Sequence, residues 1–168
     1  MPDTQQRYVT AYNYADNSPA YSDFVSRGRR RGGGGAPPND YRAEIGRNDF
    51  DNPSSLAVGP EAQLDYGSLV FIQGYGWFLV EDATEGGLSH APRFDMWTAG
   101  ATAAELDGLT GFFAVTTFGP HETVPGDWQN RVAGDAWDWE RWVSDSRLSA
   151  FRHRPSWHGL YVEGGLIL

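Results

Sequence analysis

The sequence predicts a mainly β protein built on a compact, six-stranded barrel, with a short helix and a tryptophan-rich helical extension. Three observations carry this prediction. Short runs rich in β-branched and aromatic residues recur between positions 7 and 118, and turn-forming Gly and Pro residues separate them. The last fifty residues change to a helical spacing. A chain of 168 residues is long enough for one domain with a real core and too short for two.

Six segments have the composition of strands, and they are residues 7–14, 55–58, 68–72, 77–81, 93–97 and 111–118. The apolar runs Ser68–Ile72 and Trp77–Val80 flank Gln73-Gly74-Tyr75-Gly76, and this pattern predicts a hairpin turn. Between the last two strands, residues 101–109 predict a short helix. Thr102 is placed to cap it and Glu105 to complete a capping box.

Residues 119–168 form a separate region that predicts helix rather than strand. A helix is expected from Asp135 to just before Pro155, because Trp139, Trp142 and Val143 would share one face. Five of the seven tryptophans lie in this region. They could pack on the barrel, stack on sugar rings or dock a partner. The apolar end, LYVEGGLIL, would be tucked into a sheet or buried in a neighbouring protein.

Composition excludes several function classes. The net charge of −9 argues against a general nucleic-acid binder, and without cysteine there are no disulfides or Cys-ligated metal sites. No segment is apolar enough to span a membrane, and MPDTQQRYVT lacks the features of a signal peptide. The loop at 27–40 holds Arg27, Arg29–Arg31 and a glycine run. It could contact phosphates, but on an acidic chain a solvated loop or an acidic partner is the stronger interpretation.

Two carboxylates stand at neighbouring strands. Asp82 follows the second run of the hairpin and Asp95 lies in the next strand, with aromatic residues around both. A pair of carboxylates in such a setting is what a sugar-cleaving site needs. The other interpretation is that both bond backbone amides in ordinary barrel turns.

Residues 56–97 resemble the three-aspartate domain, a double-psi β-barrel found in the membrane-bound lytic transglycosylase A family, in resuscitation-factor-like proteins and in many phage proteins. The matching segments are 56–58, 64–68, 70–76, 81–82 with 86–87, and 94–97; residues 8–12 resemble the opening strand. The chain departs from the pattern at Gly59, where the family has its first aspartate. Asp65 lies six residues later and is not an obvious substitute. The loop between Asp82 and Asp95 is also longer than the family's.

The resemblance implies that Asp95 is the catalytic acid and base and that Asp82 supports it. It implies a lytic reaction in which the sugar's own 6-hydroxyl displaces the leaving group, so neither water nor a cofactor is needed. We expect Tyr75, Trp77, Trp97 and His90 to contact the glycan strand. No metal site is expected, since His121, Glu122, His153 and His158 lack ligand spacing.

Three functions remain open at the level of sequence. The first is a degenerate barrel that serves as a structural or adaptor subunit among protein partners in a phage virion or similar assembly. The second is an active transglycosylase that cleaves peptidoglycan glycan strands through Asp95. The third is a carbohydrate-binding module that uses its tryptophans. The expected location is the virion or the cytoplasm of the producing cell.

Overall fold

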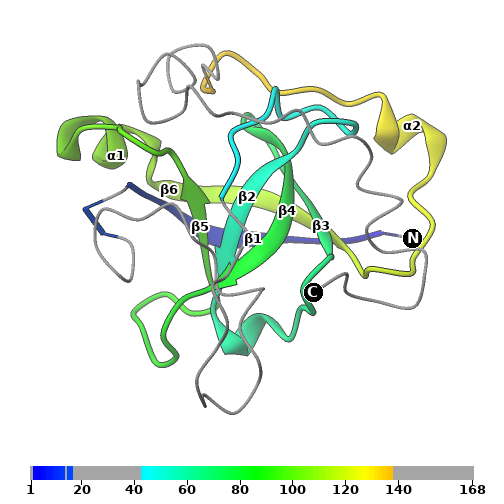
Figure 1. The fold of residues 1–168 in the computed structure, drawn as a ribbon. Helices are drawn as coiled ribbons and strands as arrows, with labels where there is room; N and C mark the ends of the chain where they lie inside the picture. Colours follow the sequence, from blue (N-terminus) through cyan, green and yellow to red (C-terminus); the bar gives the residue numbers. More distant parts are fainter. Residues whose placement is uncertain (1, 14, 17–42, 138–168) are drawn as a thin grey trace, which may run out of the picture.

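Six strands close into a barrel in the computed structural model, which describes residues 2–13, 15–16 and 43–137 (Figure 1). The strands are β1 (Asp3–Tyr12), β2 (Ser54–Val58), β3 (Leu69–Ile72), β4 (Gly76–Ala83), β5 (Arg93–Trp97) and β6 (Gly111–Phe118). Around the barrel they follow the order β1-β5-β2-β4-β3-β6. The pairs β1·β5 and β2·β4 are parallel and the other four are antiparallel. The predicted six-stranded, mainly β barrel is therefore confirmed.

The hairpin between β3 and β4 lies at the predicted turn. Leu69 pairs with Leu79 and Ile72 with Gly76. Gly74 and Gly76 have φ angles of +93° and +92°, which L side chains rarely adopt, so the turn requires glycine there. Gly76 also allows a close approach, because a Cβ atom at this position would lie 2.3 Å from the carbonyl oxygen of Asn48.

Alternation along the strands separates two apolar clusters. Alternate side chains along the strands, such as Val9, Leu56 and Phe94, point inward and fill the barrel interior. On β3, β4 and β6, the side chains that alternate with these point outward and form a second cluster outside the barrel. There Trp77 is fully buried, and Phe50 and Val124 cover it from segments before β2 and after β6. The outward face of β1, β5 and β2 is where the polar side chains described below are found.

Helix α1 (Ala103–Leu109) has the predicted capping box: the Thr102 hydroxyl accepts from the Glu105 amide, and the Glu105 side chain accepts from the Thr102 amide. The short helix α2 (Gly126–Gln129) and the 3₁₀ turn η2 (Pro60–Ala62) complete the described elements. The Arg/Gly loop at 27–40 lies outside the described residues. So does the helix expected after Asp135, except for its first residues up to Trp137. Within the described part, no helix is long and apolar enough to cross a membrane.

The two hairpin glycines form a matched pair for a stability test. Both have a φ near +93°, but a Cβ at Gly74 meets nothing within 4 Å, whereas at Gly76 it would overlap the Asn48 carbonyl. We expect Gly74→Ala to cost about 1–2 kcal/mol of unfolding free energy from backbone strain alone. Gly76→Ala should cost clearly more, because steric overlap is added. Urea unfolding measures both, and equal losses would contradict this account of the turn.

Candidate active site

Ala57, in the middle of the barrel wall, brings Asp82 and Asp95 to the same face. It pairs with Asp95 on β5 at one side and with Asp82 on β4 at the other. Residues directly opposite each other share a face, so the two carboxyl groups stand on either side of Ala57. On the far side of β5, Thr10 of β1 pairs with Asp95. The four residues form one row across four neighbouring strands.

A β-bulge in β4 gives Asp82 this position. Leu56 pairs with Val80, yet the next residue, Ala57, pairs with Asp82, so Glu81 is the extra residue. A bulge re-aims side chains that strict alternation would send to opposite faces. Glu81 is fully buried, and its Oε2 accepts a hydrogen bond of 2.7 Å from the Ser55 hydroxyl.

Asp95 is partly exposed and is held by a side chain rather than by the backbone. Its Oδ1 accepts a 2.8 Å hydrogen bond from the Thr10 hydroxyl, and its Oδ2 has no hydrogen-bond partner within the described residues. Loss of hydration on burial raises the pKa of Asp95 from 3.8 to about 7. The Thr10 bond and the charge of Arg93 oppose this rise, while Asp16 and Asp82 add to it. A carboxyl group with a pKa near 7 can both donate and accept a proton at neutral pH.

Tyr12 links the second carboxylate to the site. Its hydroxyl donates a 2.9 Å hydrogen bond to Oδ2 of Asp82, whose Oδ1 accepts from the amide of Ala83. Burial, followed by the charges of Asp82 and Asp95, raises the pKa of Tyr12, so its hydroxyl remains a donor. The charges of both carboxylates therefore act on Tyr12, and its hydrogen bond fixes the orientation of Asp82.

Sequence reasoning missed Thr10, Tyr12 and Glu81. The alternation of Tyr8, Thr10 and Tyr12 in the first strand is a signal that could have placed the hydroxyls on one face. Nothing in the sequence marks the bulge, because its position depends on how β2 and β4 pair. The hydroxyl groups on β1 and the carboxylates on β4 and β5 come together only when the barrel closes.

The aromatic residues expected to bind a glycan fall into two groups. Tyr75, Trp77 and Trp97 are at most 2 % exposed, so their rings offer no free face to a ligand. Tyr75 donates its hydroxyl hydrogen bond to the Leu109 carbonyl, and the Trp77 indole donates to that of Arg131. This burial does not fit direct binding by these three residues, because burial of large aromatic surface makes them part of the packed structure. His90 differs from them: it is exposed, and its ring centroid lies 4.6 Å from that of Tyr8.

Glu61 occupies the space beside Gly59. A Cβ at Gly59 would lie 2.8 Å from Oε2 of Glu61, and Oε1 accepts a 2.6 Å hydrogen bond from the amide of Gly87. Backbone hydrogen bonds, that of Gly87 first, lower the pKa of Glu61, so it is a carboxylate at neutral pH. Gly59 is itself bonded to β5 through the Arg93 carbonyl. A negative charge is therefore present next to the position where the resemblance expects an aspartate.

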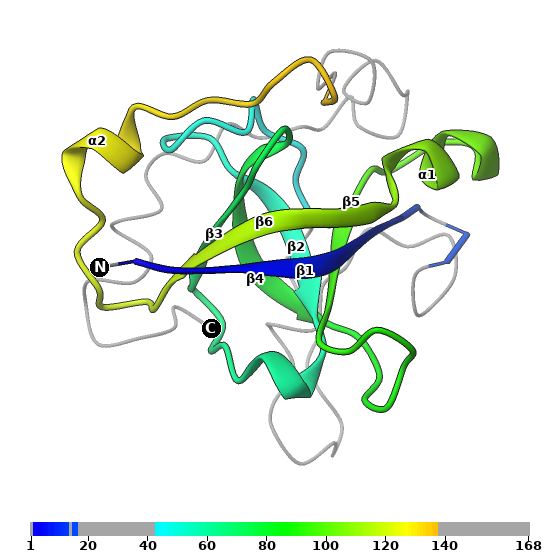
Figure 2. The same ribbon diagram turned by 180° about the vertical axis from the view of Figure 1, so that it is seen from behind.

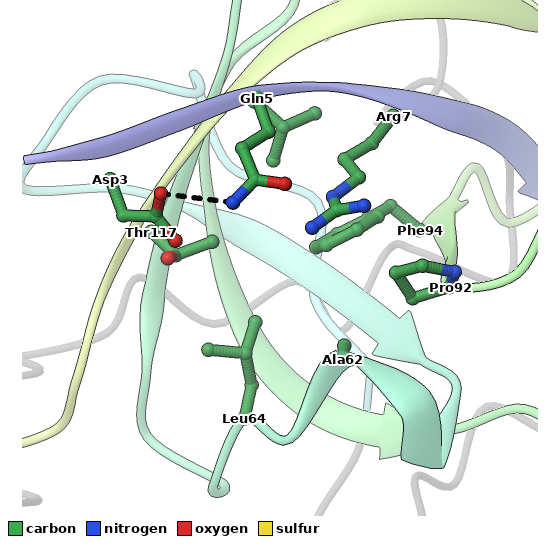
Figure 3. A pocket seen from close by; sticks show the side chains of 9 residues that line it. Asp3, Gln5, Arg7, Ala62, Leu64, Pro92, Phe94 and Thr117 are labelled. Carbon is green, nitrogen blue, oxygen red and sulfur yellow. Dashed lines mark hydrogen bonds between the residues drawn. The ribbon is translucent and has the colours of Figure 1, made fainter.

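A small pocket opens at the mouth of the barrel, away from Asp95 (Figure 3). Gln5 and Arg7 point into it above Leu64 and Ala62, and Phe94 lies beside Arg7. With a volume of about 40 Å³, it has room for a few waters and not for a sugar ring. None of the predicted site residues lines it.

Comparisons with protein-family models, with curated proteins and with solved structures gave no match to this chain. The described residues contain no group of three or more side chains placed to hold a metal ion.

The pKa of Asp95 predicts a pH-dependent stability. Because folding raises this pKa, the folded state holds the proton more tightly, and stability should fall as the pH rises from about 4 to about 7. A rise from 3.8 to about 7 corresponds to an upper limit of about 4 kcal/mol. Asp95→Asn removes the ionisation and should be more stable than the wild type at pH 8 and equal to it at pH 4. Urea unfolding at both pH values tests this, with the exposed Asp107→Asn as the control. An unchanged difference between pH 4 and pH 8 would contradict the raised pKa.

Proposed function

We propose that this barrel cleaves glycan strands without hydrolysis, with Asp95 as both the acid and the base. The observation that carries the proposal is the state of Asp95. It is a partly exposed carboxyl group with a pKa of about 7, held by one hydroxyl and not by backbone amides. Such tuning is typical of a proton-transfer group, whereas a carboxylate in a structural turn is stabilised in its charged form.

The reaction needs one titrating group. Protonated Asp95 donates its proton to the glycosidic oxygen, the bond from that oxygen to the anomeric carbon breaks, and positive charge develops on the sugar ring. The carboxylate of Asp82, oriented by Tyr12, lies on the same face and stabilises this charge. Asp95 then accepts the proton of the 6-hydroxyl as its oxygen bonds to the anomeric carbon. The product is a 1,6-anhydro sugar, and Asp95 returns to its protonated form.

The resemblance to the three-aspartate domain supports the same assignment. A closed, six-stranded mixed barrel is compatible with the double-psi topology of that domain. Asp95 and Asp82 match two of its aspartates, and they lie on either side of Ala57. We propose that Glu61 takes the place of the third, because its carboxylate reaches the space beside Gly59.

Purified peptidoglycan provides the direct test. The wild-type protein should release 1,6-anhydro muropeptides, detected by mass spectrometry, and Asp95→Asn should release none above background. Because the first step needs protonated Asp95, the rate should fall as the pH rises through about 7. Asp107→Asn, an exposed carboxylate on α1, should keep full activity.

Two other outcomes would replace the proposal. If wild type and Asp95→Asn are equally inert and the protein fixes into a large particle, the barrel is a structural or adaptor subunit. If glycan binds without turnover and quenches tryptophan fluorescence, it is a carbohydrate-binding module. Products with a free reducing end would show hydrolysis instead of the lytic reaction.

Replacement of Glu61 tests its proposed role. Glu61→Ala should lower the cleavage rate about tenfold or more, the loss expected for one stabilising charge. Adding Gly59→Asp to this variant should restore part of the rate, since the only contact under 3 Å that a side chain at Gly59 would meet is Glu61 itself. Activity unchanged by Glu61→Ala would remove Glu61 from the site.

A further inference from the structure

Three rings at the surface, those of Tyr8, His90 and Phe112, form a cluster that we call the aromatic platform. The centroid of Tyr8 lies 4.6 Å from that of His90 and 5.1 Å from that of Phe112, and the last two are 5.3 Å apart. Phe112 is 60 % exposed and His90 is exposed as well. Rings that contact one another and still face solvent are typical of a binding surface rather than of a core.

The platform lies one step along the strands from Asp95. Phe112 of β6 pairs with Tyr8 of β1, which pairs with Arg93 of β5; β6 and β1 run side by side in Figure 2. The next row on the same face, two residues on, contains Thr10 and Asp95. Two residues of strand span roughly 7 Å. A ligand stacked on the platform would therefore be a direct neighbour of the proposed acid.

Arg93 supplies a cation at the edge of the platform. Its guanidinium carbon lies 5.7 Å from the centre of the Tyr8 ring, and Nη2 donates a 3.3 Å hydrogen bond to the Ser89 carbonyl. Its Nε is buried without a hydrogen-bond partner, and its positive charge lowers the pKa of Asp95. Within the described residues, the Nη2–Ser89 bond is the hydrogen bond that Arg93 donates, so the outer nitrogens Nη1 and Nη2 keep N–H groups for a planar anion such as a carboxylate.

We propose that the aromatic platform and Arg93 form a subsite for a pyranose ring that carries a carboxylate. The apolar face of the sugar would stack on Phe112 and Tyr8, and its carboxylate would bond to Arg93. This inference rests on the proposed function only for the role of Asp95 in cleavage. A neutral sugar would leave Arg93 unused, and a nucleic acid is disfavoured by Asp82, Glu61 and the net charge of −9.

Two kinds of sugar carry this group: a muramic acid without a stem peptide, through its lactyl ether, and a uronic acid. Binding to the full-length Asp95→Asn variant, measured by isothermal titration calorimetry, separates them without turnover. The three probes are N-acetylglucosaminyl-N-acetylmuramic acid, the neutral chitobiose and a digalacturonate. We expect the muramyl disaccharide to bind at least tenfold more tightly than chitobiose, because a charge-assisted hydrogen bond is added.

Variants then locate the binding energy. Adding Arg93→Gln should abolish the preference for the muramyl disaccharide over chitobiose. Adding Phe112→Ala should lower the affinity for both of these sugars about tenfold. Val132→Ala is the matched control for Phe112→Ala, since Val132 is 66 % exposed and lies outside the platform; Arg47→Gln, also exposed, is the control for Arg93→Gln. Neither control should change binding.

The outcomes separate this subsite from the proposed function. Equal affinity for charged and neutral sugars, or binding unaffected by Phe112→Ala, would overturn the subsite even if the wild type cleaves peptidoglycan. Charge-dependent binding that needs both residues would support it even if the wild type releases no product. Tight binding of digalacturonate alone would support the carboxylate subsite and assign it to a uronic acid.

Discussion

The pairing of Ala57 with two strands at once is the constraint on which the site depends. As a member of β2, it contacts β5 antiparallel and β4 parallel, and so it fixes Asp95 and Asp82 on the same face. The bulge at Glu81 completes the arrangement. Without it, strict alternation would turn Asp82 away from Asp95.

The chemistry of the site follows from unequal environments of two like groups. Asp82 accepts hydrogen bonds from the Tyr12 hydroxyl and from the Ala83 amide. Asp95 receives one hydroxyl bond and loses much of its hydration, so its pKa rises to about 7. Two carboxyl groups in such different surroundings can divide the roles of proton donor and charge stabiliser. The fold pays for this in stability near neutral pH, where the charged form of Asp95 is disfavoured.

The proposed proton donor and the proposed subsite lie on the same outward face. Rows of paired residues lie on neighbouring strands, with Phe112, Tyr8 and Arg93 in one row and Thr10 with Asp95 in the next. The apolar clusters that hold the barrel closed take up Tyr75, Trp77 and Trp97. Among the described residues, the rings of the proposed subsite are those on β1, on β6 and in the loop before β5, and not the buried rings of Tyr75, Trp77 and Trp97.

The sequence by itself determined the strands, the hairpin and the helix cap, because each depends on local patterns: alternation, a Gly-containing turn, and Thr102 followed by Glu105. It also singled out Asp82, Asp95 and His90 by residue type and order. Only the tertiary structure decided which of these act together. The pairing of β2 with β4 and β5, the bulge and the burial of Trp77 arise from contacts between residues far apart in the chain. Such contacts set both exposure and pKa, and no local pattern encodes them.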